Sequence, residues 1–125
     1  MANRSRSNLP FHLSGTSAYG IEPLEPVAQL ELGKMKNFVY LLMDWESKKA
    51  AIIDPQEDID TPLALLTSQK FVLEKILLTH SHFDHVLGVP GLVKKFPALP
   101  VFLHEKEAHR ILKTNPEIQK NIQFI

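Results

Sequence analysis

The chain contains no cysteine, so it has neither a disulfide framework nor a thiol nucleophile, and a cysteine-rich structural zinc site is excluded. No apolar run approaches the length of a membrane span, which disfavours a membrane protein. Net charge is also absent, because 14 Lys and Arg balance 14 Asp and Glu. Nucleic-acid binding requires a basic surface, so no nucleic-acid partner is expected. The lack of cysteine is typical of a cytoplasmic protein, and cytoplasm is the predicted location.

The length of 125 residues predicts about one domain. Residues 1–20 contain Arg4, Arg6 and several serines but no acid and no periodic apolar positions, which predicts a flexible N-terminal extension before a folded part at residues 21–125. A mitochondrial transit peptide has a similar composition and remains an alternative. A secretory signal is disfavoured because the segment lacks an apolar central run.

The remaining pattern predicts an α/β fold. Strands are expected at residues 27–32, 38–43, 50–53, 75–78 and 101–103, and helices at residues 61–70, near 90–96 and at 105–113. The second and third strands should form an antiparallel hairpin with a loop of about six residues. A helix separates the third and fourth strands, so these two should be parallel. In the helix near residue 90, Leu92, Val93 and Phe96 are expected to face the core.

The sequence Thr79-His80-Ser81-His82-Phe83-Asp84-His85 follows the apolar run that ends at Leu78 and contains three of the six histidines of the chain. His80 and His82 are two residues apart, so on extended backbone both imidazoles can bind one metal ion. Asp84 and His85 follow at a spacing that suits a second ion. Zinc, iron and manganese all accept imidazole together with carboxylate, so the segment predicts a two-metal centre.

This motif resembles that of the metallo-β-lactamase superfamily. Residues 32–41 and 51–55 look like the opening hairpin of its glyoxalase II-like hydrolases, residues 101–105 look like their next strand, and the likeness covers roughly residues 27–112. The resemblance implies an αββα sandwich of which the chain is about the N-terminal half. It also implies two bound ions, zinc first among the candidates and iron or manganese as alternatives, with His80 and His82 on one ion and Asp84 and His85 on the other.

The implied activity is hydrolysis of a small-molecule thioester such as a hydroxyacylglutathione, with Asp84 as the proton acceptor for the attacking water. The family's further ligands, a third histidine, a bridging aspartate and a last histidine, lie downstream of the matched region and have no counterpart here, so an incomplete metal site is expected. Two alternatives stay open: a mononuclear iron persulfide dioxygenase, and a half-domain without catalytic activity. An exposed half-sandwich face would promote self-association.

Four further residues have side chains that could contribute to a metal site. Asp54 precedes Pro55, and two interpretations are open: the start of a turn, or a carboxylate that orients a ligand or an amide of the metal loop. His104 and His109 stand alone at a strand end and in a helix, and His12 lies in the N-terminal segment, so these three are not predicted ligands.

Overall fold

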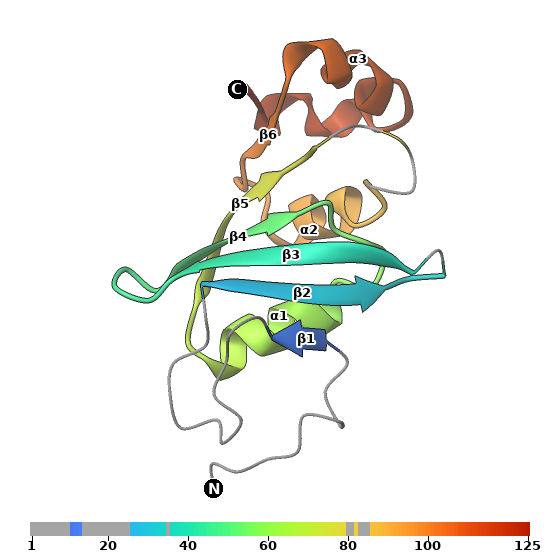
Figure 1. Ribbon diagram of the computed structural model, residues 1–125. Helices are drawn as coiled ribbons and strands as arrows, with labels where there is room; N and C mark the ends of the chain where they lie inside the picture. The colour runs from blue at the N-terminus through green and yellow to red at the C-terminus, as the bar shows by residue number, and fades with distance from the viewer. Residues whose placement is uncertain (1–10, 14–25, 35, 80–81, 83–85) are drawn as a thin grey trace, which may run out of the picture.

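The computed structural model describes residues 11–13, 26–34, 36–79, 82 and 86–125 (Figure 1). Within these residues, seven strands form one sheet and follow one another across it in chain order. The strands are β1 (Phe11–Leu13), β2 (Val27–Leu32), β3 (Asn37–Asp44), β4 (Lys49–Ile53), β5 (Val72–Leu77), β6 (Val101–Leu103) and β7 (Ile122–Phe124). The helices are α1 (Asp60–Ser68), α2 (Val89–Lys95), α3 (Glu105–Thr114) and the 3-10 helix η3 (Pro116–Asn121).

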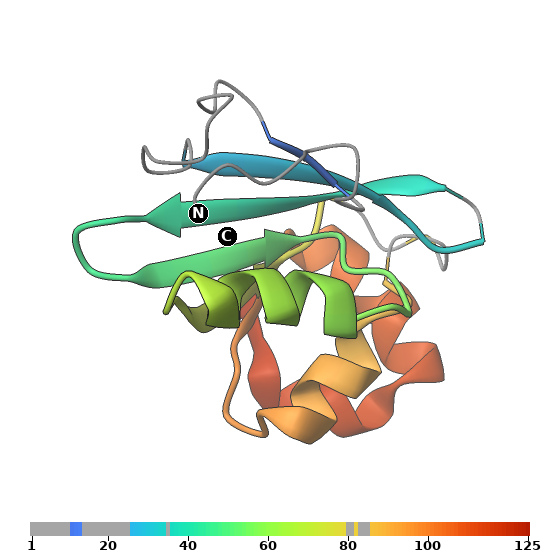
Figure 2. The ribbon, with the colours of Figure 1, turned by 90° about the horizontal axis from the view of Figure 1, so that it is seen from below.

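The sheet is antiparallel from β1 to β4 and parallel from β4 to β7. The antiparallel hairpin of β3 and β4 and the parallel pair of β4 and β5 are both confirmed. Each parallel strand is added on the same side of the previous one, and such crossovers are right-handed. The intervening helices therefore lie on the same face of the sheet, as Figure 2 shows for α1 and α2.

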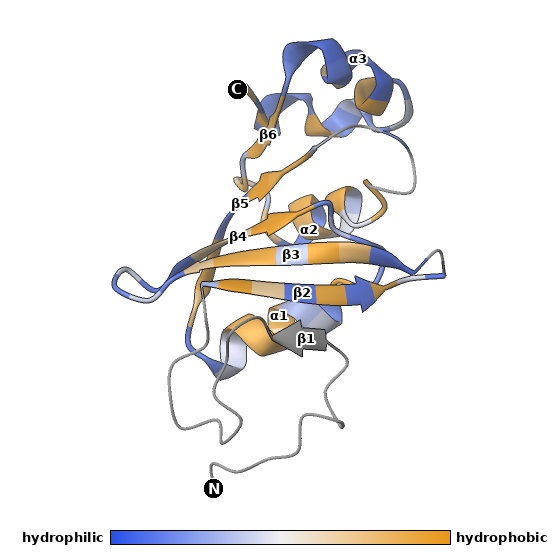
Figure 3. Cartoon of the chain, viewed as in Figure 1, coloured by the Kyte–Doolittle hydropathy of each residue, from blue (hydrophilic) through white to orange (hydrophobic). Residues whose placement is uncertain are grey.

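The core lies between the sheet and this helical layer. Alternate residues of β2, β3 and β4 point into it, and Figure 3 shows long apolar stretches in β3, β4 and β5. Fully buried members come from strands and helices alike: Leu30, Val39, Leu41, Ile52, Ile76, Val89, Leu92, Val101, Leu103, Ile111 and Ile118. Packing of these side chains holds β5 and α2 in place, and the histidine-rich segment connects those two elements.

The opposite side of the sheet, here called the open face, carries the side chains that alternate along each strand with those of the core. The register places Val27, Leu42, Ala51 and Leu77 on it, in neighbouring strands. Leu42 is 36% exposed. Lys49 and Asp44 lie on the same face at the turn between β3 and β4.

Several boundaries differ from those expected. β1 lies inside the predicted flexible extension and pairs with β2, so at least Phe11–Leu13 are part of the sheet. β5 begins at Val72 rather than Lys75, because a bulge opposite Ala50 and Ala51 accommodates Glu74. The hairpin loop is shorter than expected, since Asp44 pairs with Lys49 and leaves only residues 45–48 as the turn.

Two other features were not anticipated. Phe96, which was expected to face the core, is 37% exposed at the end of α2. The sequence also gave no indication of η3 and β7 after α3.

Candidate metal centre

Asp54 holds the start of the histidine-rich segment. It follows β4 in a left-handed conformation with φ of 52°, which Asp tolerates better than most residues. Its amide donates to the Leu77 carbonyl at 3.1 Å, and its buried carboxylate accepts a 2.9 Å hydrogen bond from the Thr79 amide and a second from the Thr79 hydroxyl. Thr79 directly precedes His80. Of the two interpretations of Asp54, the structure therefore supports the one in which its carboxylate binds a backbone amide, at the residue before the predicted ligands.

The next two residues hold the far end of the same segment. The Gly88 amide donates to the Pro55 carbonyl at 2.9 Å. A Cβ added at Gly88 would lie 2.3 Å from the Gln56 carbonyl oxygen and 2.8 Å from the Pro55 Cβ, so only glycine fits. Gly88 is the first residue before α2, and its φ of −88° is ordinary, so the requirement is purely steric. Residues 54–56 therefore anchor the chain on both sides of the predicted ligands.

Of the four predicted ligands, three, His80, Asp84 and His85, lie outside the described residues. His82 is described, and it is exposed. Within the described ranges, no group of three or more His, Cys, Asp or Glu side chains is placed to hold a metal ion. The two-metal cluster therefore stays a prediction that rests on the motif and on the anchored ends of its segment.

His82 lines a cavity of about 500 Å³ between the end of the histidine-rich segment, α2 and α3. The other lining residues are Val86, Leu87, Pro90, Arg110, Thr114 and Asn115. The last three were not among the residues predicted for the site. The sequence offered only weak grounds for predicting these residues. Arg110 and Thr114 are four residues apart, which places them on one side of a helix, but nothing in the sequence shows that α3 lies beside the motif.

His104 has a structural role that explains its position without a metal. It precedes α3 with extended backbone, and its Nδ1 accepts a 3.1 Å hydrogen bond from the Lys106 amide. This contact caps a helix amide that would otherwise lack a partner within the helix. His109 lies exposed on α3 itself. Neither observation gives these histidines a place in the predicted centre.

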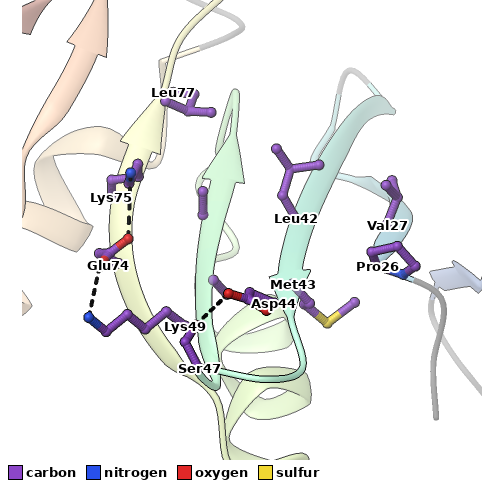
Figure 4. Close-up of a pocket in the computed structure, with 12 residues that line it drawn as sticks. Pro26, Val27, Leu42, Met43, Asp44, Ser47, Lys49, Glu74, Lys75 and Leu77 are labelled. Carbon is purple, nitrogen blue, oxygen red and sulfur yellow. Dashed lines mark hydrogen bonds and ion pairs between the residues drawn. The ribbon is translucent and has the colours of Figure 1, made fainter.

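A second cavity, of about 530 Å³, lies on the open face and has a different character (Figure 4). Val27, Leu42 and Leu77 provide apolar walls, while Glu74 lies between Lys49 and Lys75 at 3.4 and 3.5 Å. Asp44 is exposed at one end, and hydrogen bonds from the Ser47 hydroxyl and the Glu46 amide lower the pKa of its carboxyl. None of the described residues that line this cavity is a histidine.

Comparison with known proteins decides the family. The sequence profile of the metallo-beta-lactamase superfamily matches residues 34–119, well over half of the chain. The chain belongs to the metallo-beta-lactamase superfamily. It is 44% identical over 66 residues to a hydroxyacylglutathione hydrolase of Photorhabdus laumondii, a match that covers 53% of this chain and 26% of that protein. The resemblance to glyoxalase II-like members of the superfamily is thus confirmed.

Solved structures agree with this assignment. The BLEG-1 B3 metallo-beta-lactamase is 36% identical, with a TM-score of 0.60 over 66% of this chain and 39% of that one. The protein TTHA1623 in a di-iron-bound form is also 36% identical, with a TM-score of 0.56 over 65% of this chain and 39% of that one. The chain therefore has a metallo-beta-lactamase fold but spans only part of the length of these superfamily members. No helix in the described part of this superfamily chain is long and apolar enough to cross a bilayer.

Proposed function

We propose that this chain supplies the first ligands of a metal-dependent hydrolase site that acts on a small-molecule thioester of the hydroxyacylglutathione kind. The observation that carries the proposal is the anchoring of the histidine-rich segment at both ends. Asp54 binds Thr79 at one end and Pro55 binds Gly88 at the other. The two anchors lie at the carboxyl ends of parallel strands, where α/β sheets usually bind ligands, and in this proposal the segment between them supplies His80, His82, Asp84 and His85 as ligands.

The donor set fits the metals that the family implies. Imidazole and carboxylate without thiolate suit zinc, iron or manganese, and His82 opens onto a cavity that a substrate can enter. In this proposal His80 and His82 hold one ion, and Asp84 and His85 hold the second. Bound divalent metal would supply Lewis acidity and lower the pKa of a water molecule. Asp84 would be the residue of this chain that accepts a proton from the attacking water.

Within these 125 residues each ion finds two of the roughly three protein ligands that a catalytic site draws from its protein. We therefore expect weak metal binding and little or no thioester hydrolysis by the chain alone. The experiment is to titrate the purified chain with zinc, iron and manganese, to count the bound ions, and to assay hydrolysis of a glutathione thioester. His82→Ala should weaken metal binding by more than about tenfold. Loss of a residue that only hydrogen-bonds to a metal ligand already costs about tenfold, and loss of a ligand itself should cost more.

His109→Ala is the matched control, because His109 is an exposed histidine on α3 outside the motif. It should leave metal binding unchanged. Equal effects of the two substitutions would contradict the ligand assignment. Tight binding of two ions, with turnover that His82→Ala abolishes, would contradict the incomplete site and show that the missing ligands come from elsewhere, such as a second subunit.

A mononuclear iron persulfide dioxygenase is the second candidate. Iron accepts the same imidazole and carboxylate donors, and the similar protein TTHA1623 was crystallised in a di-iron-bound form, which supports iron as the metal without favouring one ion over two. Preferential retention of a single iron together with oxygen consumption, and without thioester hydrolysis, would support this alternative. Absence of metal binding at any concentration would favour a half-domain without catalytic activity.

A further inference from the structure

The cavity beside His82 has two chemically distinct walls. Val86, Leu87 and Pro90 form an apolar wall where the histidine-rich segment runs into α2. Arg110, Thr114 and Asn115 form a polar wall at the end of α3. Its volume of about 500 Å³ lies in the range of small-molecule sites, which combine an apolar lining with a few polar groups.

The polar wall is built from one side of α3. Arg110 and Thr114 are one turn apart and exposed, while Ala108 and Ile111 of the same helix are buried. The Thr114 hydroxyl donates to the Ile111 carbonyl at 3.2 Å, and the Asn115 side-chain amide donates to that hydroxyl at 2.9 Å. These two polar side chains thus bind one another and the helix end. The guanidinium of Arg110 is the charged group of the wall.

The described residues that line this cavity include no Asp or Glu beside Arg110. Glu74 pairs with Lys49 and Lys75 on the sheet, away from this cavity. The neighbouring charges on α3 are Lys106, Glu107 and Lys113, none of which lines the cavity. A guanidinium at the wall of a cavity that also contains a predicted metal ligand is suited to an anionic group, and planar carboxylates match its donor geometry.

We infer that this cavity is the pocket for the carrier part of the substrate, and that Arg110 binds a carboxylate of that carrier. The inference rests on the proposed function and names the substrate class: thioesters whose thiol part bears a carboxylate next to an apolar stretch, as glutathione does. The apolar wall takes the methylene groups of the carrier. Arg110 is thereby a specificity-determining residue, which separates carboxylate-bearing thioesters from those that lack a carboxylate.

The test measures binding without turnover. S-methylglutathione, which has no thioester bond to hydrolyse, is titrated by NMR into the metal-free full chain and into the variants Arg110→Ala, Arg110→Lys and Lys113→Ala. Loss of one charge-assisted hydrogen-bond pair should weaken binding about tenfold or more for Arg110→Ala and less for Arg110→Lys. Lys113→Ala removes a positive charge from the same helix away from the cavity and should change the affinity less than about twofold.

A second arm varies the ligand. The diethyl ester of S-methylglutathione, which has no carboxylate, should bind the unsubstituted chain as weakly as S-methylglutathione binds Arg110→Ala. Equal affinity for the acid and the ester, an unchanged affinity in Arg110→Ala, or no binding of S-methylglutathione would overturn the inference. Thermal unfolding of each variant verifies that the exposed substitutions leave the fold intact.

The outcome is separable from that of the proposed function. The protein could bind carboxylates through Arg110 and yet hydrolyse no thioester when metal and any missing ligands are supplied. That result would retain the pocket and refute the activity. Hydrolysis that is insensitive to Arg110→Ala would retain the activity and refute the pocket.

Discussion

At the scale of single residues, Asp54 has the clearest structural role. Its carboxylate binds Thr79, 25 positions away, while its left-handed backbone turns the chain out of β4. Asp58 offers a close comparison, since its carboxylate binds the Thr61 amide and hydroxyl at 3.0 and 2.6 Å at the start of α1. The two aspartates make the same pair of contacts, but only Asp54 holds a residue next to the predicted ligands.

Asp54→Ala should therefore affect both stability and metal binding. It removes hydrogen bonds to a charged acceptor, each typically worth about 1.5–3 kcal/mol, and places alanine in a left-handed conformation. We expect the free energy of unfolding in urea to fall by about 2–4 kcal/mol, and Asp54→Asn, which keeps one acceptor oxygen and tolerates the backbone, to lose less. Asp58→Ala is the control: it should lower stability but leave metal affinity unchanged. If both alanine variants reduce metal affinity equally, the role of Asp54 in positioning the segment is disproved.

At the scale of secondary structure, the elements that sequence alone predicted are those with their own hydrophobic pattern. β2, β3 and β4 alternate or run apolar, and α3 carries a clear amphipathic pattern, so their positions came out within a residue or two. β1 and β7 are three residues long, and they are strands because a neighbouring strand offers them hydrogen bonds. Such edge strands depend on tertiary pairing, which local sequence does not encode.

The candidate site shows the same division. The ligands could be predicted from the motif because their spacing is local. The Asp-Pro pair predicted a turn, but only the fold shows that the Asp54 carboxylate binds Thr79. The cavity wall on α3 could not be predicted, because it depends on how two parallel crossovers bring α3 beside the end of the histidine-rich segment. Of the four predicted ligands, only His82 lies within the described residues.

The close approach of α2 to residues 55–56 yields a prediction for the element as a whole. Gly88→Ala would place a Cβ 2.3 Å from the Gln56 carbonyl oxygen, and neither backbone can move without breaking the 2.9 Å bond from the Gly88 amide to the Pro55 carbonyl. Overpacking of this kind costs about 1–3 kcal/mol and sometimes more, so we expect a loss of about 3 kcal/mol in the free energy of unfolding.

Gly91→Ala serves as its control within the same helix. The added Cβ would lie 3.3 Å from the Ile59 Cδ1, the end of a flexible side chain, and alanine is favoured over glycine inside a helix by up to about 1 kcal/mol. This variant should be as stable as the original chain or slightly more stable. Urea unfolding compares the two, and a Gly88→Ala variant as stable as Gly91→Ala would show that the approach is not rigid.

At the scale of the whole molecule, the sheet is covered by helices on one face only among the described residues (Figure 2). The open face nevertheless has the composition of a surface that becomes covered. Ala51 is 7% exposed and Leu42 36%, and a strand such as β4, apolar on both sides, is typical of a sheet that is buried on both faces. The superfamily's αββα sandwich places a second sheet there.

For the chain by itself, we expect a second copy to cover the open face through a two-fold, sheet-to-sheet contact. Exposed apolar patches favour association, the rim carries both signs of charge in Lys49, Lys75 and Glu74, and a net charge of +0 means that two copies do not repel each other strongly. Sedimentation velocity over a concentration series should show a monomer–dimer equilibrium.

Leu42→Asp places a charge at the centre of the contact and should shift the equilibrium to monomer. Phe96→Asp is the matched control, because Phe96 is equally exposed, at 37%, at the end of α2 in the helical layer, and it should dimerise like the original chain. A chain that is monomeric at every concentration, or a Phe96→Asp variant that dissociates as readily as Leu42→Asp, would rule out self-association through the open face.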